Sequence, residues 1–172
     1  FVVDSSATVG LRGTFQTIAA ALTAASSGDD IFIRSGTYTE NLTLKAGVNL
    51  TAFSGDEQTP TVTIVGKATL KTAGTVTISN IRLQTNSDFF LAVTGSAASI
   101  VNLNNCYLNC TNNTGITYTS SSASSSVGCL NCSGNLATTG IAYFTSSSPG
   151  NISFEKSSLN NTGGSTTVST AS

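Results

Sequence analysis

Apolar residues return along this chain at a nearly constant step of about 25 residues, a spacing within the range of stacked repeat proteins. From Val76 the step leads to Val101, then to Val127 and to Ile152. Further columns with the same step are Ile78, Leu103, Cys129 and Phe154; Ile81, Cys106, Cys132 and Ser157; and Leu83, Leu108, Gly134 and Leu159. In a stacked repeat protein each repeat buries its apolar face only against its neighbours, so the repeat predicts a solenoid.

Within each repeat the apolar residues alternate with polar ones, as in the segments 76–78, 81–83 and 91–93. Alternation with a period of two predicts short strands, three to each repeat. Short β-rich runs broken by glycines extend the pattern toward the N-terminus, within 30–65. The alternative is an antiparallel β-sandwich with evenly spaced strands, which predicts hairpin turns and no register between strands one repeat apart.

A single polar residue separates the first two strands of each repeat. It is Asn80, Asn105 or Asn131, with Lys156 in the fourth repeat. Asparagine tolerates left-handed backbone angles, and its amide can bond to the copies above and below. This structural stack, an asparagine ladder at a one-residue bend, resembles the right-handed parallel β-helix of the pectate-lyase superfamily. The resemblance implies an all-β fold of three-strand coils that rise about 4.8 Å each.

One α-helix is predicted, over about residues 17–25. Ile18 and Leu22 lie on its apolar face, and Thr14 or Thr17 can cap its start. A bare coil offers unpaired backbone groups to any other strand. We therefore expect this helix to cover the N-terminal end of the solenoid as a capping helix.

The opening of the chain carries a more specific pattern. The run 13–22, the strand 31–33 and the sequence Gly-x-Tyr-x-Glu-Asn at 36–41 resemble the start of pectin methylesterases and of β-helical phage tail and surface proteins. Pectin methylesterases carry catalytic aspartates and an arginine in Gly-Thr-Val-Asp-Phe-Ile-Phe-Gly and Leu-Gly-Arg-Pro-Trp, and neither motif occurs here. The resemblance therefore implies the fold without the activity, because one fold hosts many functions.

The chain lacks the residues of the common catalytic sets. It contains no His, which excludes Ser-His-Asp, Cys-His and His-metal sites. Hydrolases of sugars need paired carboxylates. Beyond Lys67 the carboxylates are Asp88 and Glu155, which occupy different positions in the repeat and are not expected to share a face. We predict no catalytic residue, no cofactor and no metal ligand in this segment.

The four cysteines have the spacing Cys-x3-Cys and Cys-x2-Cys, at Cys106, Cys110, Cys129 and Cys132. Such spacing can form a four-cysteine zinc site or a disulfide. Cys106 and Cys132, however, share one inward position of the repeat with Ile81. Buried thiols stacked in the core are the interpretation that the repeat favours, because buried reduced cysteine is common.

Composition favours one domain and an exported or virion setting. The 172 residues form a single β-solenoid domain, with a strand and the capping helix in 1–30 and coils in 31–172, and we expect it to be part of a longer polypeptide. A net charge of −1 with seven basic residues argues against nucleic acid. No run approaches the roughly 18 apolar residues of a membrane span. Charged residues make up only 9%, so the surface is neutral and rich in hydroxyl and amide groups.

Aromatic residues outside the inward pattern are candidate contacts for glycans. Tyr107, Phe89 and Phe53 are each out of phase with the core positions or lie between strands. An exposed aromatic ring can stack on a sugar ring, and the alternative for each is packing in the core or at a corner.

These features favour a non-enzymatic structural or receptor-binding segment of a virion tail spike, fibre or surface adhesin that contacts cell-surface glycans. The alternative is a carbohydrate esterase or polysaccharide lyase of the pectin-active β-helix class, with its active residues outside this segment. A third hypothesis is a secreted carbohydrate-binding module. The last coil, around 165–168, ends in open strand edges, so we expect a homo-oligomer, with a trimer favoured, or a larger assembly.

Overall fold

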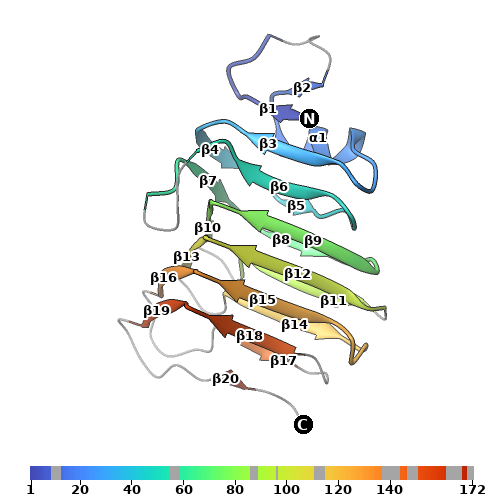
Figure 1. The fold of residues 1–172 in the computed structure, drawn as a ribbon, viewed down its shortest axis with the longest axis vertical. Coiled ribbons are helices and arrows are strands. Elements are labelled where there is room, and N and C mark those ends of the chain that lie inside the picture. Colours follow the sequence, from blue (N-terminus) through green and yellow to red (C-terminus); the bar gives the residue numbers. More distant parts are fainter. Residues whose placement is uncertain are drawn as a thin grey trace.

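The chain folds into a right-handed parallel β-helix of about four turns, closed at its N-terminal end by a helix (Figure 1). The computed structural model describes residues 1–8, 13–54, 59–85, 89–95, 97–110, 115–136, 144–146, 151–161 and 168–169. Every strand pair in it is parallel, which confirms the predicted solenoid and excludes the antiparallel sandwich. Asp88 and residues 165–167 of the predicted C-terminal edge lie outside the described residues.

Three sheets, called A, B and C, run along the molecule, and each coil adds one strand to each sheet. Sheet A contains β1 (Val2–Val3), β2 (Thr14–Phe15), β3 (Asp30–Ile33), β6 (Asn49–Ala52), β9 (Gly74–Ser79), β12 (Ser99–Asn104), β15 (Ser126–Leu130) and β18 (Asn151–Glu155). Sheet B contains β4 (Gly36–Thr39), β7 (Val62–Val65), β10 (Ile81–Thr85), β13 (Tyr107–Cys110), β16 (Ser133–Leu136) and β19 (Ser158–Asn161). Sheet C contains β5 (Leu42–Thr43), β8 (Ala68–Leu70), β11 (Leu91–Gly95), β14 (Ile116–Ser120), β17 (Phe144–Ser146) and β20 (Val168–Ser169).

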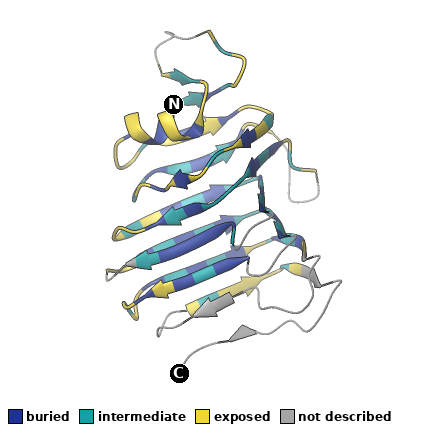
Figure 2. Cartoon of the chain, turned by 180° about the vertical axis from the view of Figure 1, so that it is seen from behind, coloured by how far each residue is buried: buried dark blue, intermediate teal, exposed yellow. Residues whose placement is uncertain are grey.

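The repeat step found in the sequence is one turn of the solenoid. Val76 pairs with Val101, Val101 with Val127, and Val127 with Ile152. Because strands one coil apart are in register, identical positions of successive repeats form columns. The valine column is fully buried over its first three members, and the core runs along the axis between the sheets (Figure 2).

The turn from sheet A to sheet B is a one-residue bend in left-handed conformation. Its φ is 61° at Asn80, 51° at Asn105, 50° at Asn131 and 50° at Lys156. The Nδ2 of Asn105 donates to Oδ1 of Asn80 at 3.2 Å, and the Nδ2 of Asn131 donates to Oδ1 of Asn105 at 3.2 Å. The three side chains therefore form a continuous hydrogen-bonded ladder along the corner between sheets A and B.

The cap is helix α1 (Ile18–Ala24), whose side chains Ile18, Ala21 and Leu22 are buried over the open end of the core. Thr17 is its N-cap and accepts a hydrogen bond from the backbone N–H of Ala20 at 3.2 Å. The predicted helix is thus present, with ends one residue inside the predicted range. Among the described residues no helix has the length and apolar character needed to cross a bilayer.

The four cysteines are buried thiols and form no disulfide. The Sγ of Cys106 donates to the carbonyl of Ile78 at 3.3 Å, and the Sγ of Cys132 donates to that of Leu103 at 3.3 Å. In the next coil the hydroxyl of Ser157 makes the same bond to the carbonyl of Cys129 at 3.2 Å. Cys106 and Cys132 therefore pack at one repeated position of the core, and each ties its coil to the coil before it. Cys110 and Cys129 are buried at two other positions of the repeat.

Candidate functional site

Each of the three aromatic residues singled out in the sequence lies against a cation. The Cζ of Arg34 is 5.3 Å from the ring centroid of Phe53, the Nζ of Lys67 is 4.7 Å from that of Phe89, and the Cζ of Arg82 is 4.6 Å from that of Tyr107. Cation–π contacts of this length hold the two side chains together at the surface. The aromatic residues follow β6, precede β11 and begin β13, so the structure does not bring them into one site.

Phe53 is the most exposed of the three and belongs to a hollow that we call the corner pocket. The pocket has a volume of about 410 Å³. It is lined by Asp4, Ser6, Arg34, Ser35, Phe53 and Ser54. These residues come from three places: the segment after β1, the bend between β3 and β4, and the segment after β6. The pocket thus lies where sheet A passes into sheet B at the capped end.

Backbone pairing fixes the relative positions of these segments. The N–H of Arg34 donates to the carbonyl of Val3 at 2.9 Å, and the N–H of Phe53 donates to the carbonyl of Ile33 at 2.9 Å. Arg34 and Phe53 are therefore neighbours in adjacent coils at the same corner. The spacing between them is set by the sheet and not by side-chain flexibility.

The pocket has an ion pair at one side. The Nε of Arg34 lies 3.4 Å from Oδ2 of Asp4, while Oδ1 of Asp4 accepts hydrogen bonds from the hydroxyl of Ser6 at 2.6 Å and from its N–H at 2.9 Å. The hydrogen bonds from Ser6, together with the charge of Arg34, lower the pKa of Asp4 below its ordinary value of 3.8. The carboxylate is therefore ionised at neutral pH and orients the guanidinium over Phe53.

A second exposed aromatic residue, Phe32, extends the apolar side of the pocket. The rings of Phe32 and Phe53 are tilted against each other with centroids 5.5 Å apart, and their exposed fractions are 40% and 53%. Of these two rings, the sequence pattern identified only Phe53 as a candidate contact. The signal for Phe32 was its place at an outward position of the strand 30–34, between the buried residues Ile31 and Ile33.

The corner pocket combines the groups that bind a sugar ring. An aromatic face takes the apolar C–H face of the sugar, a carboxylate accepts hydrogen bonds from hydroxyls, and a guanidinium donates them. Ligand sites in proteins have volumes of roughly 300–1,000 Å³ and a few convergent polar groups. The pocket meets both conditions.

Tyr107 has different surroundings. It is half-buried, the guanidinium of Arg82 covers its ring, and its hydroxyl accepts a hydrogen bond from Nδ2 of Asn135 at 2.7 Å. On the same face, Nδ2 of Asn109 donates to Oε1 of Gln84 at 3.4 Å. These five outward residues form a polar array that we call the sheet B face.

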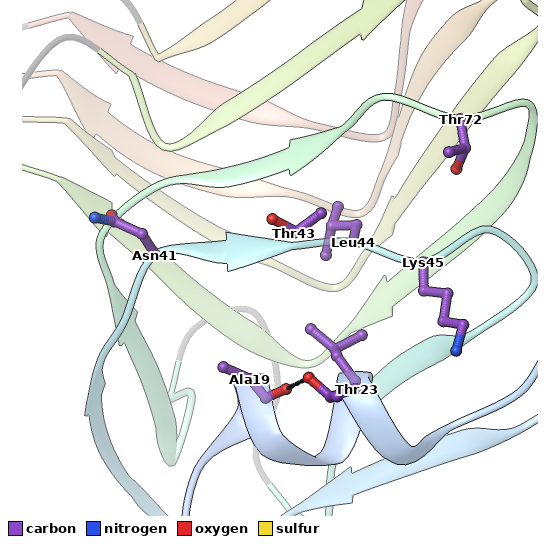
Figure 3. A pocket seen from close by; sticks show the side chains of 8 residues that line it. Ala19, Thr23, Asn41, Thr43, Leu44, Lys45 and Thr72 are labelled. Carbon is purple, nitrogen blue, oxygen red and sulfur yellow. Dashed lines mark hydrogen bonds between the residues drawn. The ribbon is translucent and has the colours of Figure 1, made fainter.

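Another hollow, of about 430 Å³, lies between α1 and β5 (Figure 3). Three of its polar side chains, those of Thr23, Asn41 and Lys45, are bonded within the protein. The Oγ1 of Thr23 donates to the carbonyl of Ala19 at 2.9 Å, the Oδ1 of Asn41 accepts from the N–H of Lys67 at 3.0 Å, and the amine of Lys45 donates to the carbonyl of Ala25. The bond of Lys45 joins the segment after β5 to the end of the cap, and the other two bonds lie within α1 and within sheet C, so the cavity is a weaker candidate for a ligand.

The fold places the chain in the class of helix-capped parallel β-solenoids. No family model, no curated protein and no solved structure matches it. The resemblance to the pectate-lyase superfamily therefore stays a prediction, and any function has to be inferred from the surface itself. Among the described residues, no group of three or more His, Cys, Asp or Glu side chains could hold a metal ion.

Proposed function

We propose that this chain is a non-enzymatic, receptor-binding structural segment of an extracellular or virion assembly, such as a tail spike, fibre or adhesin, that contacts glycans. The observation that carries the proposal is the corner pocket, in which the exposed ring of Phe53 lies beside the ion pair of Arg34 and Asp4. A pocket lined by an aromatic ring, a guanidinium and a carboxylate suits a neutral sugar ring, which has an apolar face and hydroxyls at its edge.

The solenoid supports this role because it holds surface groups in fixed rows. Adjacent coils lie about 4.8 Å apart, and the side chains of each strand alternate between core and surface. A site built on strands in register needs little ordering when a ligand binds, and preorganisation of this kind improves affinity. We further propose that the chain assembles into a homo-oligomer, with a trimer as the favoured state.

The test is a screen of the chain on a glycan array, followed by calorimetric titration of the best ligand. We expect Phe53→Ala to weaken binding by about tenfold or more, and Phe53→Tyr to retain it, because a stacked aromatic contact contributes about 0.5–1.5 kcal/mol beyond its buried area. Leu130→Ala is the matched control, since Leu130 is also an exposed apolar residue, 37% exposed, but lies far along the solenoid in β15.

Equal effects of Phe53→Ala and Leu130→Ala would show that the corner pocket is not the binding site. Turnover of methylated pectin by the protein would contradict the structural proposal and favour the esterase or lyase.

The pH dependence of binding gives an independent check. Because the pKa of Asp4 is lowered in the folded protein, its carboxylate stays ionised down to a pH below 3.8 and is then protonated. Binding should therefore be constant between pH 7 and pH 5, by titration, and fall only below about pH 4. Asp4→Asn should remove this loss of binding at low pH.

A further inference from the structure

The sequence contains seven Asn-x-Ser/Thr triplets in which x is not proline, the acceptor pattern for N-linked glycosylation. They begin at Asn41, Asn49, Asn109, Asn112, Asn131, Asn151 and Asn160. Such triplets arise easily in a chain this rich in Asn, Ser and Thr, so the pattern by itself selects none of them. Asn112 and the side chain of Asn160 lie outside the described residues, and the other five asparagines have different surroundings.

Four of these five amides are hydrogen-bonded within the fold. In Asn49, Asn109 and Asn131 the Nδ2 donates to a neighbouring side chain, at 2.9, 3.4 and 3.2 Å respectively. In Asn41 the Oδ1 accepts from the N–H of Lys67 at 3.0 Å. A glycan attached to Nδ2 replaces one of its two hydrogens and places a bulky group beside it, so it competes with the bonds that this nitrogen makes.

Asn151 is different. It is exposed, and its side chain makes no hydrogen bond with the described part of the chain. Its backbone is held in β18, where its N–H donates to the carbonyl of Ser125 at 3.3 Å. Ser153, the hydroxyl residue of the triplet, is also exposed and lies two positions further along the strand. The two side chains therefore project from the same outward face of sheet A.

The surface beside this triplet carries small groups. Its register partners in β15 are Ser126, opposite Asn151, and Gly128, opposite Ser153. A Cβ placed on Gly128 would lie 3.7 Å from the Oγ of Ser153. A larger side chain at this position would cover the hydroxyl of the triplet, and the glycine leaves it open.

We infer that Asn151 is the site of an N-linked glycan when the chain is exported through a secretory pathway. In this reaction the Nδ2 of Asn151 forms a bond to the anomeric carbon of an oligosaccharide carried on a polyprenyl diphosphate. The bond from that carbon to the diphosphate oxygen breaks, the diphosphate leaves with the electron pair, and one amide proton is released.

The attached glycan would have a consequence for assembly. An N-linked glycan is bulky and solubilising, so it covers the outward face of sheet A around β18 and keeps that face from packing against another subunit. The inference concerns a covalent modification and not a bound ligand, so it goes beyond the proposed function and does not depend on it.

The experiment is secretion of the chain from cultured mammalian cells, followed by peptide-N-glycosidase treatment in heavy-oxygen water and peptide mass spectrometry. The enzyme converts each glycosylated asparagine to an aspartate that carries the heavy oxygen, which locates the modified sites. We expect this label at Asn151 in most secreted chains and its absence at Asn49, Asn109 and Asn131.

Asn151→Gln and Ser153→Ala should each remove the label, and Ser153→Thr should retain it, because either hydroxyl residue completes the triplet. Ser126→Ala, which alters the outward neighbour outside the triplet, is the matched control and should leave the label at Asn151. An unlabelled Asn151 in the secreted chain, or higher occupancy at Asn49 or Asn131 than at Asn151, would overturn the inference. The chain without substitutions gives this result by itself, so the test stands even where a variant fails to fold.

Discussion

At the scale of the residue, the asparagine bend shows why one amino acid recurs at a fixed step. A left-handed backbone costs an ordinary L-residue about 1–2 kcal/mol, and asparagine is among the residues that tolerate it best. Asn105 also both donates to Asn80 and accepts from Asn131 through its side chain. Lys156 adopts the same angle without an amide, so the bend itself does not require asparagine. The ladder adds the hydrogen bonds.

Two substitutions at Asn105 separate backbone strain from amide bonding. Asn105→Leu should lower the free energy of unfolding by about 1–3 kcal/mol, because it removes both amide bonds and places leucine in the left-handed region. Asn105→Gly should cost less, since glycine adopts that conformation without strain. Urea denaturation of the two variants measures the difference. A loss for glycine as large as that for leucine would show that strain plays no part.

At the scale of the element, the cap depends on a contact between distant segments. A seven-residue helix is too short to be stable by itself in water. The carboxylate of Glu40, directly after β4, accepts hydrogen bonds from the N–H groups of Ile18 at 3.0 Å and Ala19 at 2.9 Å. It therefore binds the first turn of α1, where the helix leaves N–H groups without partners and carries partial positive charge. The glutamate of the Gly-x-Tyr-x-Glu-Asn pattern thus has a structural role here.

Replacing that carboxylate should loosen the cap. Glu40→Gln keeps the shape but loses the charge and one of the two acceptor oxygens, and should lower the free energy of unfolding by about 0.5–2 kcal/mol. The control is Glu155→Gln, which alters an exposed carboxylate at the end of β18. The same drop in melting temperature for both variants would argue against a capping role for Glu40.

At the scale of the whole molecule, one continuous core joins the cap to the later coils, and the cysteines report on its integrity. Cys106, Cys110, Cys129 and Cys132 are all buried, and burial raises the pKa of Cys106 well above its usual range. A thiol reacts as its thiolate and only when a reagent can reach it. The thiols are therefore accessible only when coils separate.

A thiol reagent at pH 8 should leave all four cysteines of the native protein unmodified. The reaction time is the time that the reagent needs to modify a small-molecule thiol completely. All four thiols should react after denaturation in urea. Mass spectrometry of the labelled chain counts the modified residues, and a chelator added beforehand should leave the melting temperature unchanged. Rapid labelling of one cysteine in the native state would place that residue outside the packed core.

The sequence predicted the coils better than the site, and the coil lengths explain why. Where the repeat keeps a constant step, as from Val76 to Val101, columns of residues can be aligned by counting. Near the cap the step changes. Asp30 pairs with Asn49, whereas Leu50 pairs with Ile78, so a short coil is followed by a longer one. Counting therefore cannot place Arg34 beside Phe53, because loop lengths between strands vary there without a periodic signal.

The sheet B face could be predicted only in part for a different reason. Tyr107 was identified as out of phase with the core, and it follows Arg82 by one repeat step, which predicts that the two are neighbours. The unpartnered Nε of Arg82 depends on how the side chains are packed, and no spacing in the sequence encodes it.

The parallel sheets also give the molecule a mechanical direction. Its strands run across the long axis, so the backbone hydrogen bonds between coils point along that axis (Figure 1). Tension between the two ends pulls on these hydrogen bonds along their own direction and can separate adjacent coils one at a time. A force across the long axis instead loads all the hydrogen bonds between two adjacent coils together, in shear. A shaft of this construction resists compression and lateral force better than it resists being pulled apart lengthwise, and it needs support at its ends wherever it is put under tension.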